Sequence, residues 1–172
     1  MHKKSNIVIT GFSGCGKTTI GKLVAQKLGK HFIDTDEIIE KETKMSVYEI
    51  FVRNGEAFFR NMEKRAVKDI EKVENTVIAC GGGAGIDPEN IESLKRTGII
   101  IELIADPAIV IERLLKEQGQ RPLIQGKTKE EIMKLYKIRM TCSAQSDIVI
   151  DAGTLSPKSV AEKIIQHYRK VL

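Results

Sequence analysis

Five short apolar runs recur along the chain, at residues 6–10, 31–34, 76–80, 98–104 and 147–151. In this order they read NIVIT, HFID, TVIAC, GIIIELI and DIVID. Several of them are apolar almost throughout, which is typical of parallel strands that are covered on both faces. We therefore predict that the five runs are the strands of one parallel sheet.

Longer amphipathic stretches separate these runs, and several begin with a recognisable helix start. The start signals are Asp87–Pro88, Asp106–Pro107, Ser156–Pro157 and two capping boxes, Ser46 with Glu49 and Thr128 with Glu131. Alternation of strand and helix implies right-handed crossovers, so the predicted fold is α/β, three-layer α/β/α with a five-stranded parallel sheet. Because no repeat or linker interrupts this pattern, residues 1–172 are predicted to form a single domain.

The stretch KEQGQRPLIQGKTK, residues 116–129, follows neither the helical nor the strand period. It is polar, contains two glycines and a proline, and joins two predicted helices. Connections of this length are usually functional or disordered. It is either a mobile surface loop or, as we prefer because of its central Arg-Pro pair, a mobile lid at about residues 116–128.

Composition and charge narrow the class of protein. The net charge is +5, but the lysines are scattered, tryptophan is absent, and no aromatic residues interleave with arginine as in a nucleic-acid stacking surface. No apolar run approaches the roughly 18 residues of a spanning helix, and the N-terminus lacks an apolar signal core. We expect a cytoplasmic monomer whose partners are small anionic molecules, with no nucleic acid and no membrane.

Three cysteines, Cys15, Cys80 and Cys142, lie far apart and form no CxxC pair. A structural zinc site and a disulfide framework are therefore not expected, and free thiols fit a reducing compartment. Packing is the simplest role for each of them. Cys15 differs because it lies in a glycine-rich loop, where backbone N–H groups and a nearby lysine can lower the pKa of a thiol.

The segment GFSGCGKT, from Gly11 to Thr18, matches the phosphate-binding pattern G-x-x-x-x-G-K-[ST]. It follows a predicted strand and precedes an amphipathic helix that is expected to begin near Lys17, so a chance glycine turn is a poor explanation. Backbone N–H groups and the helix N-terminus would surround phosphate oxygens, Lys17 would reach the β- and γ-phosphates, and Thr18 would ligate Mg²⁺. ATP is the expected nucleotide, because no N-K-x-D guanine-reading element follows.

Two carboxylates, Asp34 and Asp36, come at the end of the second predicted strand, where ligands bind in open α/β sheets. One can lie in the outer shell of Mg²⁺ while the other faces an acceptor hydroxyl. The alternative is that Asp36 only caps the helix DEIIEKE. Their spacing does not decide between these roles.

Further along the chain, one predicted helix ends at Gly55 and another begins after it. Across this break, Phe51, Phe58 and Phe59 are expected to cluster with Arg60. In one interpretation, Arg60 only pairs with Glu56 or Glu63 on its own helix and the phenylalanines are core residues. In the other, an arginine above an aromatic wall binds a substrate carboxylate.

Three glycines, Gly81, Gly82 and Gly83, follow the third predicted strand. They are expected where a ligand or another backbone comes close. Arg121 in the predicted lid and Arg139 in the next helix add positive charge, and a closing lid would exclude water from a phosphoryl transfer.

Taken together, these pieces resemble the shikimate kinase family, within the nucleoside-monophosphate-kinase-like P-loop group. The resemblance covers about residues 7–151 and rests on GFSGCGKTTIG, DTD, IFVRNGEAFFR, GGGA and RPL in this order, with an arginine at 139. It implies ATP-dependent phosphorylation of the 3-hydroxyl of shikimate, with Mg²⁺ as the metal.

The resemblance also implies a role for each matching position. Catalysis would fall to Lys17, Asp36 and Arg121, and the metal would be held by Thr18 and, through water, Asp34. ATP would be bound by Gly14, Cys15, Gly16, Lys17, Thr18, Thr19, Arg113 and Arg121, with residues 154–157 near adenine. Helices at about residues 36–73 would form much of the acceptor site, whose residues would be Asp36, Phe51, Phe59, Arg60, Glu63, Gly82, Gly83, Pro122 and Arg139.

The chain departs from the family pattern after Arg139, where the family usually has a tyrosine and then an Ala-Asp pair. Here the sequence is RMTCSAQSD, with Ser143 near the tyrosine position and Ser146 in place of the alanine. Two alternatives stay open: a kinase for another small hydroxy acid such as gluconate, and a P-loop switch NTPase that acts through partner proteins. The switch would leave Arg60, the three glycines and the lid arginine without a function.

Overall fold

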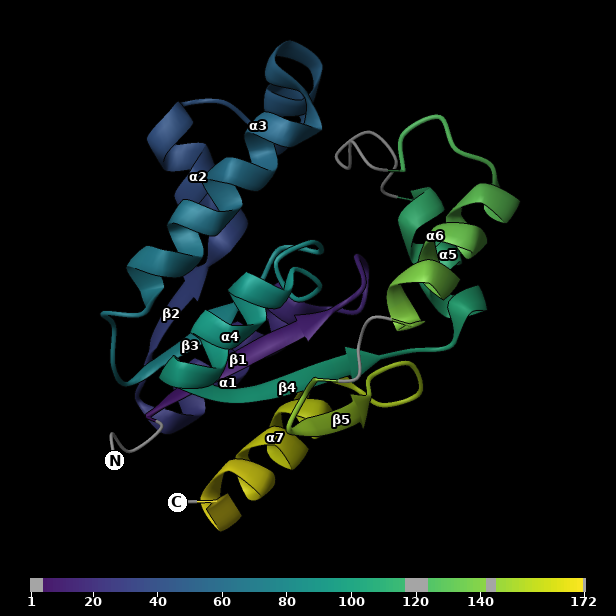
Figure 1. The fold of residues 1–172 in the computed structure, drawn as a ribbon. Helices are drawn as coiled ribbons and strands as arrows, with labels where there is room; N and C mark the ends of the chain where they lie inside the picture. Colours follow the sequence, from purple (N-terminus) through teal and green to yellow (C-terminus); the bar gives the residue numbers. More distant parts are fainter. Residues whose placement is uncertain (1–4, 117–123, 142–144, 172) are drawn as a thin grey trace.

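A computed structural model of the chain describes residues 5–116, 124–141 and 145–171 (Figure 1). Within these residues the order of elements confirms the predicted alternation of strands and helices. The strands are β1 (Asn6–Gly11), β2 (His31–Asp34), β3 (Thr76–Ala79), β4 (Gly98–Ile104) and β5 (Ile148–Asp151). The helices are α1 (Lys17–Leu28), α2 (Thr35–Thr43), α3 (Val47–Ile70), α4 (Pro88–Thr97), α5 (Pro107–Lys116), α6 (Lys129–Thr141) and α7 (Pro157–Val171).

All five described strands are parallel, and their order across the sheet is β2-β3-β1-β4-β5. Ile9 of the central strand β1 is in register with Ala79 of β3 and Ile101 of β4. The carboxyl ends of parallel strands share one edge of a sheet, which is where ligands bind in folds of this kind. That edge therefore receives the segments that follow β1, β2 and β3, which are the glycine-rich loop, the Asp34–Asp36 pair and the three glycines.

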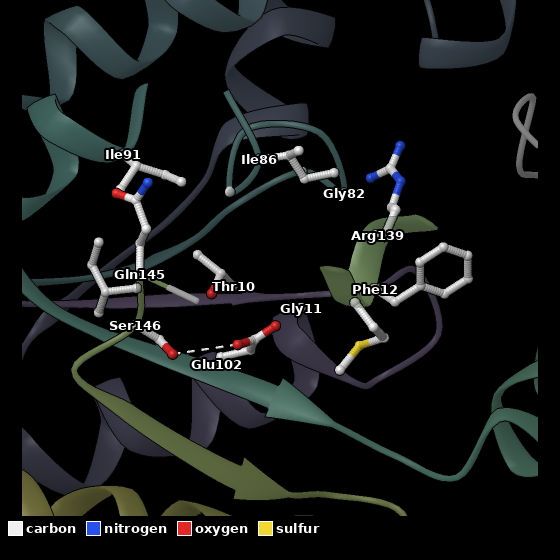
Figure 2. A pocket seen from close by; sticks show the side chains of 14 residues that line it. Thr10, Gly11, Phe12, Gly82, Ile86, Ile91, Glu102, Arg139, Gln145 and Ser146 are labelled. Carbon is white, nitrogen blue, oxygen red and sulfur yellow. Dashed lines mark hydrogen bonds between the residues drawn. The ribbon is translucent and has the colours of Figure 1, made fainter. Parts of the chain in front are cut away.

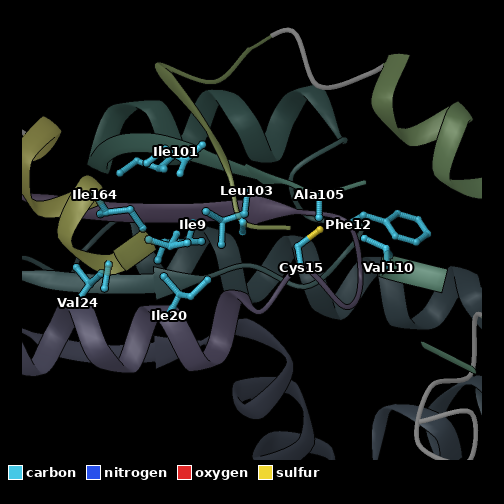
Figure 3. Packing of buried hydrophobic residues seen from close by; sticks show 14 of the residues in the cluster. Ile9, Phe12, Cys15, Ile20, Val24, Ile101, Leu103, Ala105, Val110 and Ile164 are labelled. Carbon is cyan, nitrogen blue, oxygen red and sulfur yellow. The ribbon is translucent and has the colours of Figure 1, made fainter. Parts of the chain in front are cut away.

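Helices cover both faces of the sheet, as predicted for a three-layer fold. Ile7 and Ile9 of β1 belong to a core formed with α1, α5 and α7, and Figure 3 shows Ile20, Val24 and Ile164 packed there. Val8 points to the opposite face and packs in a second core with residues of α3 and α4. Because successive strand side chains alternate between faces, one apolar strand serves two layers.

The long helix α3 contains a break at Gly55, whose φ of 82° and ψ of 170° are not helical. A φ in this range is readily adopted only by glycine. The sequence predicted this break, and the structure confirms it as a kink between two helical segments. Ser46 caps the first segment with the predicted capping box to Glu49. The second segment carries most of the buried residues of α3 and continues to Ile70.

None of the helices in the described part of the chain combines the length and apolarity that a bilayer span requires.

Candidate active site

The glycine-rich loop leads directly into α1, as the phosphate-binding pattern predicts. Gly14 and Gly16 have φ values of 84° and 87°, and Gly16 is the residue that precedes the first helical residue, Lys17. The Lys17 ammonium donates hydrogen bonds to the carbonyl oxygens of Gly11 (2.9 Å) and Phe12 (3.0 Å). The N-terminus of a twelve-residue helix and a lysine therefore meet in one loop, an arrangement that attracts phosphate.

Cys15 belongs to this loop, and its side chain points into the core rather than into a site for phosphate. It is 1% exposed and packs in the same cluster as Ile9, Leu103 and Ala105 (Figure 3). Burial raises the pKa of its thiol, and this outweighs the lowering effect of Lys17 and Arg113. The expectation that the loop lowers the pKa of Cys15 is therefore wrong, because the side chain is on the desolvated side of the backbone.

We expect iodoacetamide to alkylate Cys15 at least about tenfold more slowly in the folded protein than in the urea-unfolded chain at the same pH, because the thiol is buried and protonated. Mass spectrometry of tryptic peptides over time measures both rates. Cys80 is the matched control, since it is also 1% exposed and burial also raises its pKa. Rapid native labelling of Cys15 with slow labelling of Cys80 would show that the loop does activate the thiol.

The carboxylate pair after β2 divides into two different environments. Asp34 caps α2, with its Oδ1 accepting from the backbone N–H of Asp36 (3.0 Å), and its Oδ2 accepts from the Thr18 hydroxyl (2.7 Å). The alternative that Asp36 caps this helix is wrong, because α2 begins one residue after Asp34. The Asp36 side chain is thus left available to the cavity described below.

The Thr18 hydroxyl and the Asp34 carboxylate fit Mg²⁺ by chemistry, since both are hard oxygen donors. In the described ranges no group of three or more His, Cys, Asp or Glu side chains is arranged to hold a metal ion. Mg²⁺ usually takes only one or two protein oxygens together with water and nucleotide phosphates. The Thr18–Asp34 pair is therefore a donor set suited to Mg²⁺ carried by a nucleotide.

Asp36 is half-buried beside other acids with its Oδ1 fully buried, and the pKa of its carboxyl group is raised from 3.8 to about 7. Burial is the largest cause, followed by the negative charges of Asp34 and Glu63. Among the described residues its Oδ1 finds no hydrogen-bond partner. The same oxygen lies so close to Gly81 that a Cβ at that position would collide with it. The first of the three glycines therefore makes room for this carboxyl group.

A cavity of about 440 Å³, here named the Arg60 cavity, opens between α2, α3 and α6 next to the glycine-rich loop. Seven of the nine residues predicted for the acceptor site line it, whereas Glu63 does not and Pro122 lies outside the described residues; the seven are Asp36, Phe51, Phe59, Arg60, Gly82, Gly83 and Arg139. Phe12, Glu40, Glu56 and Lys127 also line it, although the sequence did not single them out as site residues. The cavity therefore combines acids and several cations with an aromatic wall.

Arg60 is held in this cavity by two acids of its own helix. Its guanidinium donates to Glu63 at 2.9 Å and to Glu56 at 2.9 and 3.2 Å. The Glu63 side chain is 1% exposed, so this ion pair is largely desolvated on one side, whereas the Arg60 side chain is 27% exposed. Both predicted pairings of Arg60 are confirmed, and they orient the guanidinium toward the cavity rather than exclude it.

The aromatic wall consists of Phe51 and Phe59, whose ring centroids are 4.9 Å apart. The Arg60 guanidinium carbon lies 5.5 Å from the Phe59 ring centroid. Phe58 does not belong to this wall: it is 37% exposed and does not line the Arg60 cavity, so its predicted place in the cluster is wrong. On the opposite side, the Arg60 guanidinium lies so close to Gly83 that a Cβ at that position would displace it.

A second, smaller cavity lies on the other side of Phe12, Gly82 and Arg139, and these three residues line both cavities. It has a volume of about 30 Å³ and is here named the Glu102 cavity (Figure 2). The Ser146 hydroxyl donates to the carboxylate of Glu102 (3.3 Å), which is 6% exposed. The departure from the family pattern at Ser146 therefore supplies a hydrogen bond to a buried acid.

On the nucleotide side, Arg113 of α5 donates to the carbonyl oxygen of Gly14 at 3.4 Å, so this predicted ATP-binding residue lies beside the loop. Thr19 is exposed on the first turn of α1. At the end of the predicted lid, Ile124 is buried and accepts from the backbone N–H of Lys127, just before the capping box that starts α6. The predicted residues Arg121, Pro122 and Ser143 lie outside the described residues.

Sequence patterns could have revealed some of the additional lining residues. Glu40 lies four residues after Asp36 on α2, so the helical period places both on one face. Phe12 occupies an unspecified position of the phosphate-binding pattern, which carries no side-chain information. Lys127 had no signal beyond its place at the end of the lid.

The chain is similar in sequence and in fold to several known proteins. A family model described as "Shikimate kinase" matches residues 13–169. The chain is 46% identical to a shikimate kinase of Thermodesulfovibrio yellowstonii, covering 96% of each chain, and 46% identical to one of Caldicellulosiruptor saccharolyticus, covering 93% of each. A structure of the Acinetobacter baumannii shikimate kinase in complex with shikimate superposes with a TM-score of 0.90 at 32% identity, over 96% of this chain and 93% of that one. From the fold, the gathered residues and this similarity over nearly the whole length, it follows that the chain belongs to the shikimate kinase family.

Proposed function

We propose that this protein transfers the γ-phosphoryl group of ATP to the 3-hydroxyl of shikimate, yielding shikimate 3-phosphate and ADP. The observation that carries the proposal is the Arg60 cavity, which places Asp36, Arg60 and Arg139 together beside the phosphate loop. An acceptor that bears both hydroxyl groups and a carboxylate matches a cavity in which the Asp36 carboxyl group faces the two guanidinium groups of Arg60 and Arg139. The position of the cavity next to the helix N-terminus matches a phosphoryl acceptor.

The donor half of the site consists of the loop, Lys17, Thr18 and Asp34. Lys17 is bonded to the carbonyl oxygens of Gly11 and Phe12 and would turn from them toward the β- and γ-phosphates of ATP. Mg²⁺, held through Thr18 and Asp34, would supply positive charge at the phosphate oxygens. Arg121 would add a further cation from the lid, a role that the family resemblance implies. Arg113 is proposed to lie beside the nucleotide because it contacts Gly14.

The acceptor half positions the nucleophile. Asp36 would accept a hydrogen bond from the reacting hydroxyl, and a pKa of about 7 suits a group that receives a proton near neutral pH. Arg60, oriented by Glu63, and Arg139 would bind the substrate carboxylate at the far end of the ring. Phe51 and Phe59 would pack against the ring carbons. Together these contacts fix one hydroxyl in line with the phosphorus, which is the main requirement of a loose phosphoryl transfer.

The test is ADP release with ATP and Mg²⁺ in the presence of shikimate, gluconate, quinate or no acceptor. We expect shikimate alone to stimulate turnover strongly, with a background rate in its absence that is at least about a hundredfold lower, because positioning supplies most of the acceleration. Stimulation by gluconate instead would establish the other small-acid kinase. Hydrolysis that no acceptor stimulates would favour a switch NTPase and would refute the proposal.

Two further features remain part of the proposal. We propose that the protein acts as a monomer and that it lies in the cytoplasm, where the free thiols of Cys15 and Cys80 fit a reducing compartment. Light scattering at micromolar concentration tests the oligomeric state, and a dimer mass would contradict it.

A further inference from the structure

Phe12 is the second residue of the glycine-rich loop, and its side chain lies in the partition between the Arg60 and Glu102 cavities. It is 7% exposed. Its backbone carbonyl belongs to the donor half, since it accepts a hydrogen bond from Lys17. Its ring faces the other way, toward α6, and Figure 2 shows the Arg139 guanidinium beside it. One residue of the phosphate loop therefore touches both halves of the site.

The ring of Phe12 is fixed by Tyr136 of α6. The two ring centroids are 5.2 Å apart with an interplanar angle of 72°, an edge-to-face contact of favourable geometry. Tyr136 is itself anchored, because it is 6% exposed and its hydroxyl donates to the carbonyl oxygen of Ala105 at 2.6 Å. Phe12 thus has a defined position that does not depend on solvent-exposed contacts.

Arg139 follows Tyr136 by three residues, so both side chains project from one side of α6 toward Phe12. The Arg139 guanidinium carbon lies 5.8 Å from the centroid of the Phe12 ring, within the range of a cation–π contact. A guanidinium nitrogen of Arg139 is also close to Gly82, where an added Cβ would lie 3.2 Å from it. Phe12 and Gly82 therefore flank the guanidinium on two sides.

We propose that Phe12 is a positioning residue for the phosphoryl transfer: its ring holds the Arg139 guanidinium toward the Arg60 cavity and thereby sets the affinity for the acceptor carboxylate. This inference rests on the proposed function, in which Arg139 binds that carboxylate. Arginine has many rotamers, and a ring that selects one of them lowers the entropy lost when the acceptor binds. Phe12 is thus a determinant of acceptor binding as well as a residue of the glycine-rich loop.

The first experiment compares steady-state kinetics of the wild type with Phe12→Leu and Phe12→Tyr. We expect Phe12→Leu to raise KM for shikimate about tenfold while kcat and KM for ATP stay within about twofold, the size of effect expected for a partly desolvated cation–π contact. Phe12→Tyr keeps the ring and is expected to retain a KM near that of the wild type. Phe32→Leu is the matched control, since Phe32 of β2 also contacts a cation, Lys22, but lines neither the Arg60 nor the Glu102 cavity.

A double-mutant cycle separates the positioning role from general loss of packing. In an Arg139→Ala background, we expect Phe12→Leu to change KM for shikimate by less than about twofold, because the group that Phe12 positions is gone. An equal rise in KM with and without Arg139 would overturn the inference. So would an unchanged KM in Phe12→Leu alone when Arg139→Ala raises it, which would leave the proposed function intact. If Arg139→Ala itself has no effect on KM, the carboxylate role of Arg139 fails and the inference fails with it.

Discussion

Replacing Asp36 with asparagine is expected to lower kcat/KM for shikimate by about a thousandfold, within the range measured for a positioned acid or base. The amide cannot receive the hydroxyl proton, and it presents an N–H group where the carboxylate would accept a hydrogen bond. Steady-state ADP release measures the loss. ATP binding, followed with a fluorescent nucleotide analogue, is expected to stay within about threefold of the wild-type affinity, because Asp36 does not belong to the donor half.

The same substitution is expected to flatten the pH dependence of stability, in the direction that follows from the raised pKa. Folded Asp36 keeps its proton up to about pH 7, whereas an ordinary aspartate releases it near 3.8. Between these two pH values the folded state binds more protons at Asp36 than the unfolded state does. The contribution of Asp36 to the wild-type free energy of unfolding therefore falls as pH rises, by up to about 4 kcal/mol. Asp36→Asn removes this contribution.

Urea unfolding at pH 4.5 and pH 8, without nucleotide or Mg²⁺, measures that difference. At pH 8 the variant is expected to be at least as stable as the wild type, so its loss of activity cannot come from unfolding. A variant that unfolds more easily than the wild type at pH 8 would contradict the buried, destabilised carboxylate. Shikimate turnover at the wild-type rate would contradict the catalytic role.

Replacing Arg60 with alanine is expected to damage binding and folding together. KM for shikimate should rise by at least about a hundredfold, since a charged contact to the substrate carboxylate is lost. The free energy of unfolding should fall by about 3 kcal/mol, because Glu63 is 1% exposed and would lose its ion-pair partner. Kinetics and urea unfolding of the same preparation measure both effects.

Two companion variants separate these effects. Arg65→Ala removes a guanidinium from the same helix, where it pairs with Glu42 at the surface, and is expected to change stability by less than about 1 kcal/mol without changing KM. Adding Glu63→Gln to Arg60→Ala is expected to restore part of the stability, because it removes the unpaired buried charge, but not the KM. Full recovery of KM in the double variant would show that Arg60 acts only by neutralising Glu63.

The fold was predictable because its signals are local. The apolar runs give strands, and the residues that cap helices, such as Ser46 and Asp87, act within a few residues of chain. The parallel sheet then brings the ends of β1, β2 and β3 to one edge, so the predicted site residues meet there. The ion pair between Arg60 and Glu63 was also predictable, because residues three positions apart on a helix lie on the same face.

The remaining features depend on which way a side chain points after the chain has folded. Cys15 belongs to a loop with a known backbone function, yet its thiol packs in the core and is 1% exposed. The capping role falls to Asp34 rather than Asp36 through a one-residue difference in where α2 begins. Phe12 contacts Tyr136 and Arg139, more than 120 positions away in sequence, and no local pattern encodes that contact.

The break at Gly55 also divides the wall of the Arg60 cavity into a rim that is largely exposed and a part that is anchored in the core. After the break, Phe59 and Glu63 are buried and tie Arg60 to the core. Before it, among the described residues 47–54, only Ile50 is buried, while Val47 and Phe51 line the cavity. A substitution library confined to residues 47–54, with Ile50 kept, would therefore reshape the rim for acids with other rings while leaving the catalytic groups in place.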